Sequence, residues 1–99
     1  MIFDITPQDL HRLLQQQDVY LLDVREPFEH ADFNIGGELI PLDDVMSNAS
    51  AIPKDKPVIV YCKRGIRSQI AIQRLQDKFG FTNLINLSGG MEAWKKEII

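Results

Sequence analysis

The single cysteine of the chain, Cys62, is followed within five residues by three cations, Lys63, Arg64 and Arg67. The thiolate is the nucleophilic form of cysteine, and an unperturbed thiol has a pKa of about 8.5. Nearby positive charges favour the ionised form. Gly65, in the middle of this cluster, permits a tight backbone turn that a residue with a Cβ resists. These residue types at this spacing predict an activated thiol that acts on an anionic substrate.

The elements on either side indicate how this cysteine is positioned. Val58–Tyr61 is an apolar run that follows a proline and is rich in β-branched residues, which is typical of a strand buried on both faces. Beyond the loop, apolar residues recur at spacings of three and four and predict a helix over residues 67–79. These are Ile70, Ala71, Ile72, Leu75 and Phe79. A strand, a tight loop and a helix N-terminus together build an anion site, because backbone N–H groups and the positive end of the helix dipole converge there.

Strands and helices alternate along the rest of the chain, with short connections. The predicted strands are residues 1–5, 19–22, 39–40, 58–61 and 83–87. Besides residues 67–79, helical patterns begin after Thr6, cover Pro27–Asp32, recur weakly over 42–51, and close the chain around Met91, Trp94 and Ile98. This alternation favours an α/β fold in one domain, residues 1–99, with a parallel sheet and helices on both faces. Trp94, at helical spacing from Met91, is expected to pack in the core and not to stack on a substrate.

Bulk composition excludes several functional classes. The net charge is −3, so no overall basic surface indicates a nucleic-acid partner. One cysteine excludes an internal disulfide, and two histidines at positions 11 and 30 provide no metal-ligand spacing, so no metal and no cofactor is expected. No apolar run approaches membrane length and no signal peptide is recognisable, so we expect a cytoplasmic protein with no membrane partner. No surplus amphipathic face indicates an oligomeric state.

Asp23 and Arg25 follow the second predicted strand. In an open α/β sheet, ligands gather beyond the carboxyl ends of the strands, so both side chains lie in the zone of the cysteine loop. A structural ion pair or a capping role is the preferred interpretation, and a role in bracing the loop is compatible with it.

Three stretches of the sequence resemble the rhodanese-like sulfurtransferases. The first is Cys62-x-x-Gly65-x-Arg67-Ser68, similar to the active-site loop of that family; the others are Leu22–Pro27 and Leu87–Trp94. They occur in the family's order and together span nearly the whole chain. The resemblance implies a three-layer α/β/α fold with a five-stranded parallel sheet, whose strand order alternation alone does not fix. It also implies that Asp23 and Arg25 are mostly architectural.

The resemblance implies a sulfurtransferase in which Cys62 takes a sulfur atom from thiosulfate or a persulfide and passes it to a second nucleophile. The active-site loop, Lys63, Arg64, Gly65, Ile66, Arg67 and Ser68, would hold the charged sulfur with its N–H groups and attract the anionic donor. Arg67 would also tie the loop to the sheet. A side-chain general base is not needed if the thiol is already ionised.

The sequence departs from the family's pattern near residue 34. Asn34 stands where many members carry a histidine, a proline is missing, and the stretch is about one residue shorter. His30 lies four residues upstream and does not replace that histidine. Similar Asn-Ile-Gly-Gly-Glu-Leu-Ile-Pro runs occur in rhodanese-like domains attached to sulfur-carrier-activating enzymes. A sulfur-relay protein, such as a cysteine desulfurase or a sulfur carrier, is therefore a candidate partner beside a small anionic donor.

Three alternatives compete with this interpretation. A cysteine phosphatase or arsenate reductase also uses a cysteine, a backbone cradle and an arginine, but phosphatases place five residues between cysteine and arginine, whereas Cys62 and Arg67 are separated by four. A non-catalytic binding module with this fold would be expected to lack the nucleophile. Finally, Cys62 could be a buried apolar residue beside a solvated charged face.

Overall fold

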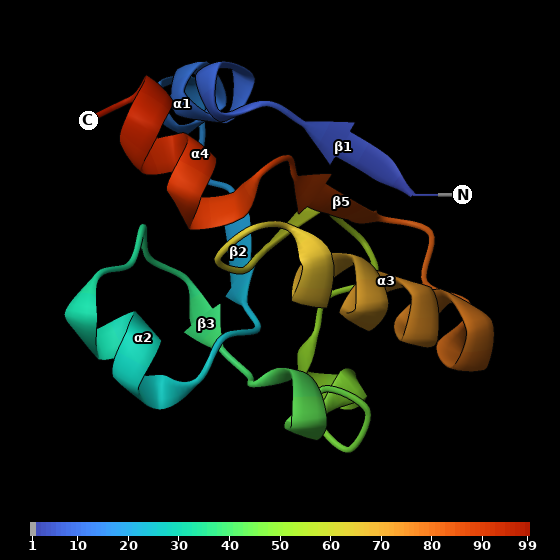
Figure 1. The fold of residues 1–99 in the computed structure, drawn as a ribbon. Coiled ribbons are helices and arrows are strands. Elements are labelled where there is room, and N and C mark those ends of the chain that lie inside the picture. Colours follow the sequence, from blue (N-terminus) through green and yellow to red (C-terminus); the bar gives the residue numbers. More distant parts are fainter. Residues whose placement is uncertain (1) are drawn as a thin grey trace.

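The computed structural model describes residues 2–99 and contains a five-stranded parallel sheet with the strand order β1-β5-β4-β2-β3 (Figure 1). The strands are β1 (Phe3–Ile5), β2 (Tyr20–Asp23), β3 (Glu38–Leu39), β4 (Val58–Tyr61) and β5 (Leu84–Leu87). The predicted α/β fold with a five-stranded parallel sheet is confirmed. Met1, which the first predicted strand included, lies outside the described residues.

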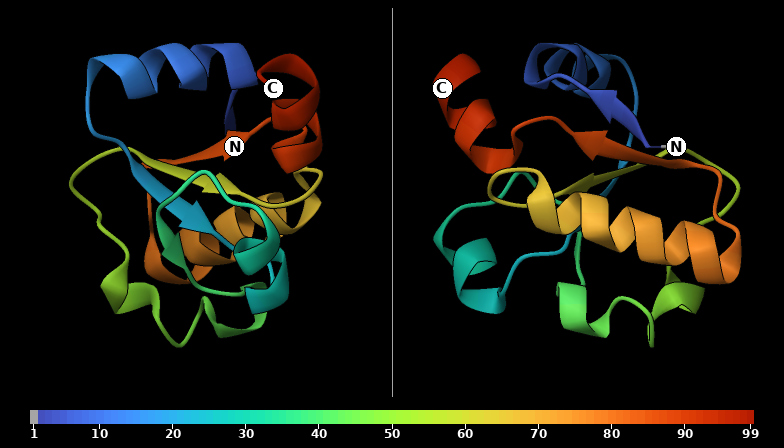
Figure 2. Two further views of the ribbon diagram at one scale, coloured as in Figure 1. Left: turned by 90° about the vertical axis from the view of Figure 1, so that its left-hand side faces the viewer. Right: turned by 45° about the vertical axis from the view of Figure 1, so that its right-hand side comes forward.

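Helices cover both faces of the sheet (Figure 2). They are α1 (Pro7–Gln16), α2 (Pro27–Asp32), α3 (Ile66–Phe79) and α4 (Gly90–Glu97), with two 3₁₀ turns, η1 (Leu42–Asp44) and η2 (Ala49–Ala51). One core cluster joins the sheet to α1 and α4, and the other joins it to α3 and the segment containing η1 and η2. The result is three layers, with α2 beside the edge strand β3 (Figure 1).

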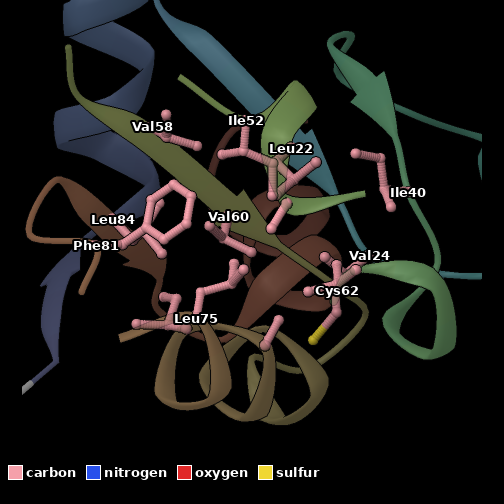
Figure 3. Packing of buried hydrophobic residues seen from close by; sticks show 14 residues of the cluster. Leu22, Val24, Ile40, Ile52, Val58, Val60, Cys62, Leu75, Phe81 and Leu84 are labelled. Carbon is pink, nitrogen blue, oxygen red and sulfur yellow. The ribbon is translucent and has the colours of Figure 1, made fainter. Parts of the chain in front are cut away.

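The central strand β4 is completely buried, with 0% exposure at every residue. Val58 and Val60 face the layer of α3, whereas Ile59 and Tyr61 face the layer of α1 and α4, as the alternation of side chains along a strand requires. Figure 3 shows Cys62 at the carboxyl end of this strand, on the same side as Val60 and above α3. A strand buried on both faces therefore delivers the cysteine to the top of the sheet.

The backbone shows why two of the predicted helices begin and end where they do, and where Trp94 lies. Thr6 is the N-cap of α1, and its Oγ1 accepts a hydrogen bond from the Asp9 N–H at 3.1 Å. Gly80 ends α3 in the left-handed conformation with φ 68°. Trp94 is 6% exposed and packs in the core, as expected from its spacing.

The weakly helical segment 42–51 forms η1 and η2 and no α-helix. The reason lies in its polar side chains. Ser47 Oγ and Asn48 Nδ2 both donate hydrogen bonds to the backbone carbonyl of Asp44. Such local side-chain bonds satisfy backbone groups without a regular helix.

Candidate active site

Cys62 lies in the turn between β4 and α3, and its side chain is only 1% exposed. Gly65 is in the left-handed region with φ 89°, which curls the loop back towards the sulfur. The Gly65 N–H donates to Cys62 Sγ at 3.1 Å, and the Ser68 N–H donates to it at 3.4 Å. Ser68 Oγ lies 3.4 Å from the same sulfur. The sulfur thus lies in a cradle of donors at the N-terminus of α3.

This cradle lowers the pKa of the Cys62 thiol. Burial acts in the opposite direction and would raise it. Hydrogen bonds from the Ser68 side chain and from the backbone N–H groups of Ser68, Arg64 and Gly65 outweigh burial, so the pKa lies below its ordinary value. Burial is the largest single influence on this pKa, and these hydrogen bonds are the main influences that lower it.

The first turn of α4 clamps the loop from above. The Met91 N–H donates to the Cys62 carbonyl at 2.8 Å, and the Glu92 N–H donates to the Lys63 carbonyl at 2.9 Å. Gly90 makes this approach possible, because a Cβ at its position would lie 2.4 Å from the Cys62 carbonyl oxygen. The Gly89-Gly90 pair is therefore part of the site as well as a tight turn.

Two of the three loop cations are engaged in ion pairs. Arg67 donates two hydrogen bonds to the Glu29 carboxylate, at 2.7 and 2.9 Å, and so ties the loop to α2. The prediction that Arg67 ties the loop to the sheet is wrong, because this side chain leaves the first turn of α3 towards the neighbouring helix. Arg64 pairs with Glu92 of α4 at 3.0 Å. Within residues 2–99, Lys63 makes no ion pair and is the loop cation available to an incoming anion.

The Arg67–Glu29 pair is the stronger of the two contacts. The hydrogen bonds that Arg67 donates to the Glu29 carboxylate are the main reason that the pKa of Glu29 is lowered to about 2, although partial burial would raise it. The side chains of Arg64 and Glu92 are 65% and 53% exposed, so their pair is largely screened by water.

Asp23 and Arg25 form a buried pair beneath the loop, in keeping with the structural interpretation. Arg25 Nη2 lies 2.8 Å from Asp23 Oδ2 and also donates to the Phe33 carbonyl at 2.7 Å. His30 Nδ1 lies 2.8 Å from Asp23 Oδ2. Neither Asp23 nor Arg25 has a hydrogen bond to Cys62; together with His30 they hold the end of β2, α2 and the following turn in place.

Asn34 has a local role in that turn. Its Oδ1 accepts from the Gly36 N–H at 2.8 Å, and its Nδ2 donates to the His30 carbonyl at 2.8 Å. The Tyr61 hydroxyl donates to the Gly36 carbonyl at 2.9 Å. Asn34 thus shapes the turn after α2 and lies away from the sulfur cradle.

Two hollows adjoin the loop. One, of about 420 Å³, is lined by Cys62, Lys63, Arg64, Ile66 and Arg67. The other, of about 530 Å³, lies between α2 and α4 and shares Lys63 with the first. Ile66 is 62% exposed beside the first hollow, and Phe28 of α2 is 74% exposed beside the second. A small anion entering the first hollow therefore meets Lys63 and the mouth of the cysteine loop.

Other kinds of site find no support in the described chain. Among residues 2–99, no group of three or more His, Cys, Asp or Glu side chains is arranged to hold a metal ion. None of the helices described is both long and apolar enough to cross a membrane.

The chain belongs to the rhodanese-like domain family: the model of that family matches residues 6–97. This confirms the resemblance carried by the three motifs. The fold agrees, because a rhodanese-related protein from Thermoplasma volcanium superimposes with a TM-score of 0.84 at 29% sequence identity, over 97% of this chain and 93% of that one.

Three curated relatives indicate which class of reaction this family likeness supports. A protein named sulfurtransferase from Allochromatium vinosum is 37% identical to this chain. The alignment covers 97% of this chain and 91% of that protein. The thiosulfate sulfurtransferase GlpE of Coxiella burnetii is 31% identical, over 96% of this chain and 89% of its own. The probable adenylyltransferase/sulfurtransferase MoeZ of Mycobacterium tuberculosis is 36% identical over 95% of this chain, which spans only a quarter of MoeZ. Family and relatives together support a sulfurtransferase in general terms.

Sequence reasoning identified the loop itself and missed the residues that reach it from elsewhere. Glu29, Asn86 and Glu92 contact the loop side chains, yet none was singled out. One signal was available for Asn86: it is a polar residue within a buried strand, and buried polar groups need partners. The partners of Arg64 and Arg67 left no such signal, because acidic residues on short helices are ordinary surface composition.

Proposed function

We propose that this protein moves a sulfane sulfur from an anionic donor, thiosulfate or a persulfide, to a thiophilic acceptor through a persulfide on Cys62. The observation that carries the proposal is the convergence of the Gly65 and Ser68 N–H groups on a buried cysteine sulfur. These donors stabilise negative charge on sulfur without a side-chain base. The lowered pKa of Cys62 supports a nucleophile that is ionised near neutral pH.

In the loading step, an electron pair of the Cys62 thiolate attacks the outer sulfur of thiosulfate. A sulfur–sulfur bond forms to Cys62, the bond to the sulfonate sulfur breaks, and its electron pair leaves with sulfite. The negative charge moves to the outer sulfur of the persulfide, next to the loop. Lys63 attracts the donor at the mouth of the site, since it is the loop cation without an acidic partner within residues 2–99.

In the unloading step, an acceptor nucleophile such as cyanide or a protein thiolate attacks the outer sulfur, and the Cys62 thiolate is regenerated. Because the two substrates react in turn with one sulfur atom, the kinetics are ping-pong. A protein partner such as a cysteine desulfurase or a sulfur carrier fits a site that is flanked by the exposed side chains of Phe28 and Ile66. The likeness to part of MoeZ supports such a relay, and the likeness to GlpE supports a small donor.

The proposal is tested by intact mass. The reduced protein, freed of reductant, is incubated with thiosulfate, and its intact mass is measured before and after cyanide is added. We expect thiosulfate to add one sulfur atom and cyanide to remove it. Cys62→Ser should gain none. A persulfide donor is the second arm. If neither donor loads Cys62, the sulfurtransferase proposal is wrong and a binding module takes its place.

A further inference from the structure

Beneath the loop, a line of polar side chains runs from the sulfur of Cys62 to the edge of the sheet. Ser68 Oγ lies 3.4 Å from Cys62 Sγ and donates to Asn86 Oδ1 in a short hydrogen bond. Asn86 Nδ2 donates to Asp4 Oδ1 at 3.0 Å. Asp4 and Asn86 are register partners on the neighbouring strands β1 and β5, so the sheet fixes their distance.

The chemistry of the end residue orients every group in this line. A carboxylate only accepts hydrogen bonds, so Asp4 faces the Asn86 NH₂ group, and the Asn86 oxygen is turned towards Ser68. The Ser68 hydroxyl has one proton to donate and gives it to that oxygen. Ser68 is 0% exposed and Asn86 is 1% exposed, so water does not substitute for either partner. While its proton is donated to Asn86, Ser68 presents a lone pair to the sulfur, which suits a Cys62 thiol; in the thiolate the hydroxyl can donate to the sulfur instead.

We propose that Asn86, oriented by Asp4, is a positioning residue that holds the Ser68 hydroxyl proton while Cys62 Sγ is uncharged and yields it to Sγ when that sulfur is a thiolate. The hydroxyl rotates between two acceptors and no covalent bond changes. In the thiolate, the charge is on Sγ and attracts the proton of Ser68. In the thiol, Sγ–H donates to Ser68 Oγ, and the hydroxyl returns to Asn86.

The same exchange follows sulfur loading, a part of the inference that rests on the proposed function. In a persulfide the charge sits on the outer sulfur and Sγ is a neutral, two-bonded atom. The Ser68 proton then has its better acceptor in Asn86, and the Gly65 and Ser68 N–H groups remain for the charged end. A neutral amide suits this role because its oxygen is a weaker acceptor of the Ser68 proton than a thiolate and a better one than a neutral sulfur. A carboxylate in its place would be a stronger acceptor and would hold the Ser68 proton in every state.

Charged and titratable groups lie on the elements around the cysteine loop, and the test must leave them unchanged. They are Lys63, Arg64 and Arg67 of the loop and α3, Asp23 and Arg25 at the end of β2, Glu29 and His30 of α2, Glu92 of α4 and Asp4 of β1. Substitutions at Ser68 and Asn86 change no charge, so differences among those variants report the hydroxyl exchange.

The experiment is the pH profile of Cys62 alkylation by iodoacetamide, a neutral reagent. Asn86→Leu removes the competing acceptor, so the Ser68 proton belongs to the thiolate, and alkylation below the midpoint should become about threefold to tenfold faster. Ser68→Ala should slow it by a similar factor. In the double variant, Asn86→Leu should have no further effect. A slower reaction in Asn86→Leu, or an effect that persists without Ser68, would show that Asn86 only supports the fold.

Asp4→Ala provides a second variant at an exposed position, should Asn86→Leu fail to fold. Without Asp4 the Asn86 side-chain amide is free to rotate by half a turn, which would take its oxygen away from Ser68. We therefore expect faster alkylation of Cys62, as in Asn86→Leu, and no such increase in a Ser68→Ala background. A change that survives there would be a simple charge effect and would overturn the role of Asp4. Phe3→Ala, an exposed neighbour on β1, is the matched control and should leave the profile unchanged. Alkylation needs no sulfur donor, so this result stands apart from the mass test of the proposed function.

Discussion

Arg67 and Glu29 join the first turn of α3 to α2 through two parallel hydrogen bonds of 2.7 and 2.9 Å, 38 residues apart in sequence. No residue of α2 is fully buried, so this helix owes its position to polar contacts of this kind. The pair fixes one wall of the site relative to the cysteine loop. It also gives the fold a dependence on pH.

Glu29→Gln should remove stability that depends on pH. The folded-state pKa of Glu29 is about 2, whereas the pKa of a glutamate in the unfolded chain is about 4.3. Its pairing stabilises the fold above the higher value, and this contribution is lost as the pH falls towards the lower one. Urea unfolding at about pH 6 should show a loss of about 1 kcal/mol in the free energy of unfolding of the variant, and at about pH 2 the difference should disappear. Glu92→Gln, in the exposed pair with Arg64, should change little at either pH; an equal loss for Glu29→Gln at both would refute the ion-pair explanation.

The Cys62 thiol should react at lower pH in the folded protein than in the unfolded chain. Its pKa is lowered only while the loop donors surround the sulfur. The same protein in urea supplies the reference, since it has no other cysteine. We expect the midpoint of the alkylation profile to rise towards about 8.5 on unfolding. Coincident midpoints would mean that burial cancels the hydrogen bonds.

Gly90→Ala should displace the cysteine loop. A Cβ there would lie 2.4 Å from the Cys62 carbonyl oxygen, and the residue already has a φ of 59°. We expect a loss of roughly 2 to 4 kcal/mol in the free energy of unfolding and a large loss of Cys62 reactivity. Gly80→Ala is the matched control: its φ is 68° with open space around it, so it should cost only about 1 kcal/mol and leave Cys62 reactivity intact.

Asp23→Asn should destabilise the protein strongly without abolishing the thiolate. The substitution leaves Arg25, 4% exposed, as a buried cation without its counter-ion. Breaking such a pair costs about 3 to 5 kcal/mol, measured by urea unfolding. Asp9→Asn, in the exposed pair with Arg12, should cost less than about 0.5 kcal/mol. If Cys62 alkylation disappeared in Asp23→Asn while the protein stayed folded, Asp23 would have a direct role in the chemistry.

Lys63→Glu should raise the KM for thiosulfate by about threefold to tenfold at low salt, with a smaller effect at high salt, because its charge attracts the anionic donor. Steady-state kinetics with cyanide as acceptor measure this. Lys78→Glu, in the last turn of α3, is the matched control and should leave KM unchanged. A change confined to kcat would place Lys63 in the reaction and not in attraction.

The parts of this site that could be predicted from the sequence are those whose residues are close together in the sequence. Cys62, Gly65 and Ser68 lie within one turn of chain, so their convergence follows from a strand, a glycine and a helix start. Glu29 and Glu92 reach the loop only because α2 and α4 flank the end of the sheet, and no spacing encodes that. The strand order likewise depends on crossover connections that local patterns do not specify. Segment 42–51 shows the converse limit, since a helical spacing of apolar residues did not outweigh the side-chain bonds of Ser47 and Asn48.

The clamp of α4 on the loop also orders events during synthesis. The N–H groups that bind the carbonyls of Cys62 and Lys63 belong to residues 91 and 92, and β5 must be placed before them. Cys62 precedes Met91 by 29 residues in the sequence, so the cysteine is synthesised before those donors. The cysteine loop therefore reaches its final geometry only when α4, near the end of the chain, is in place.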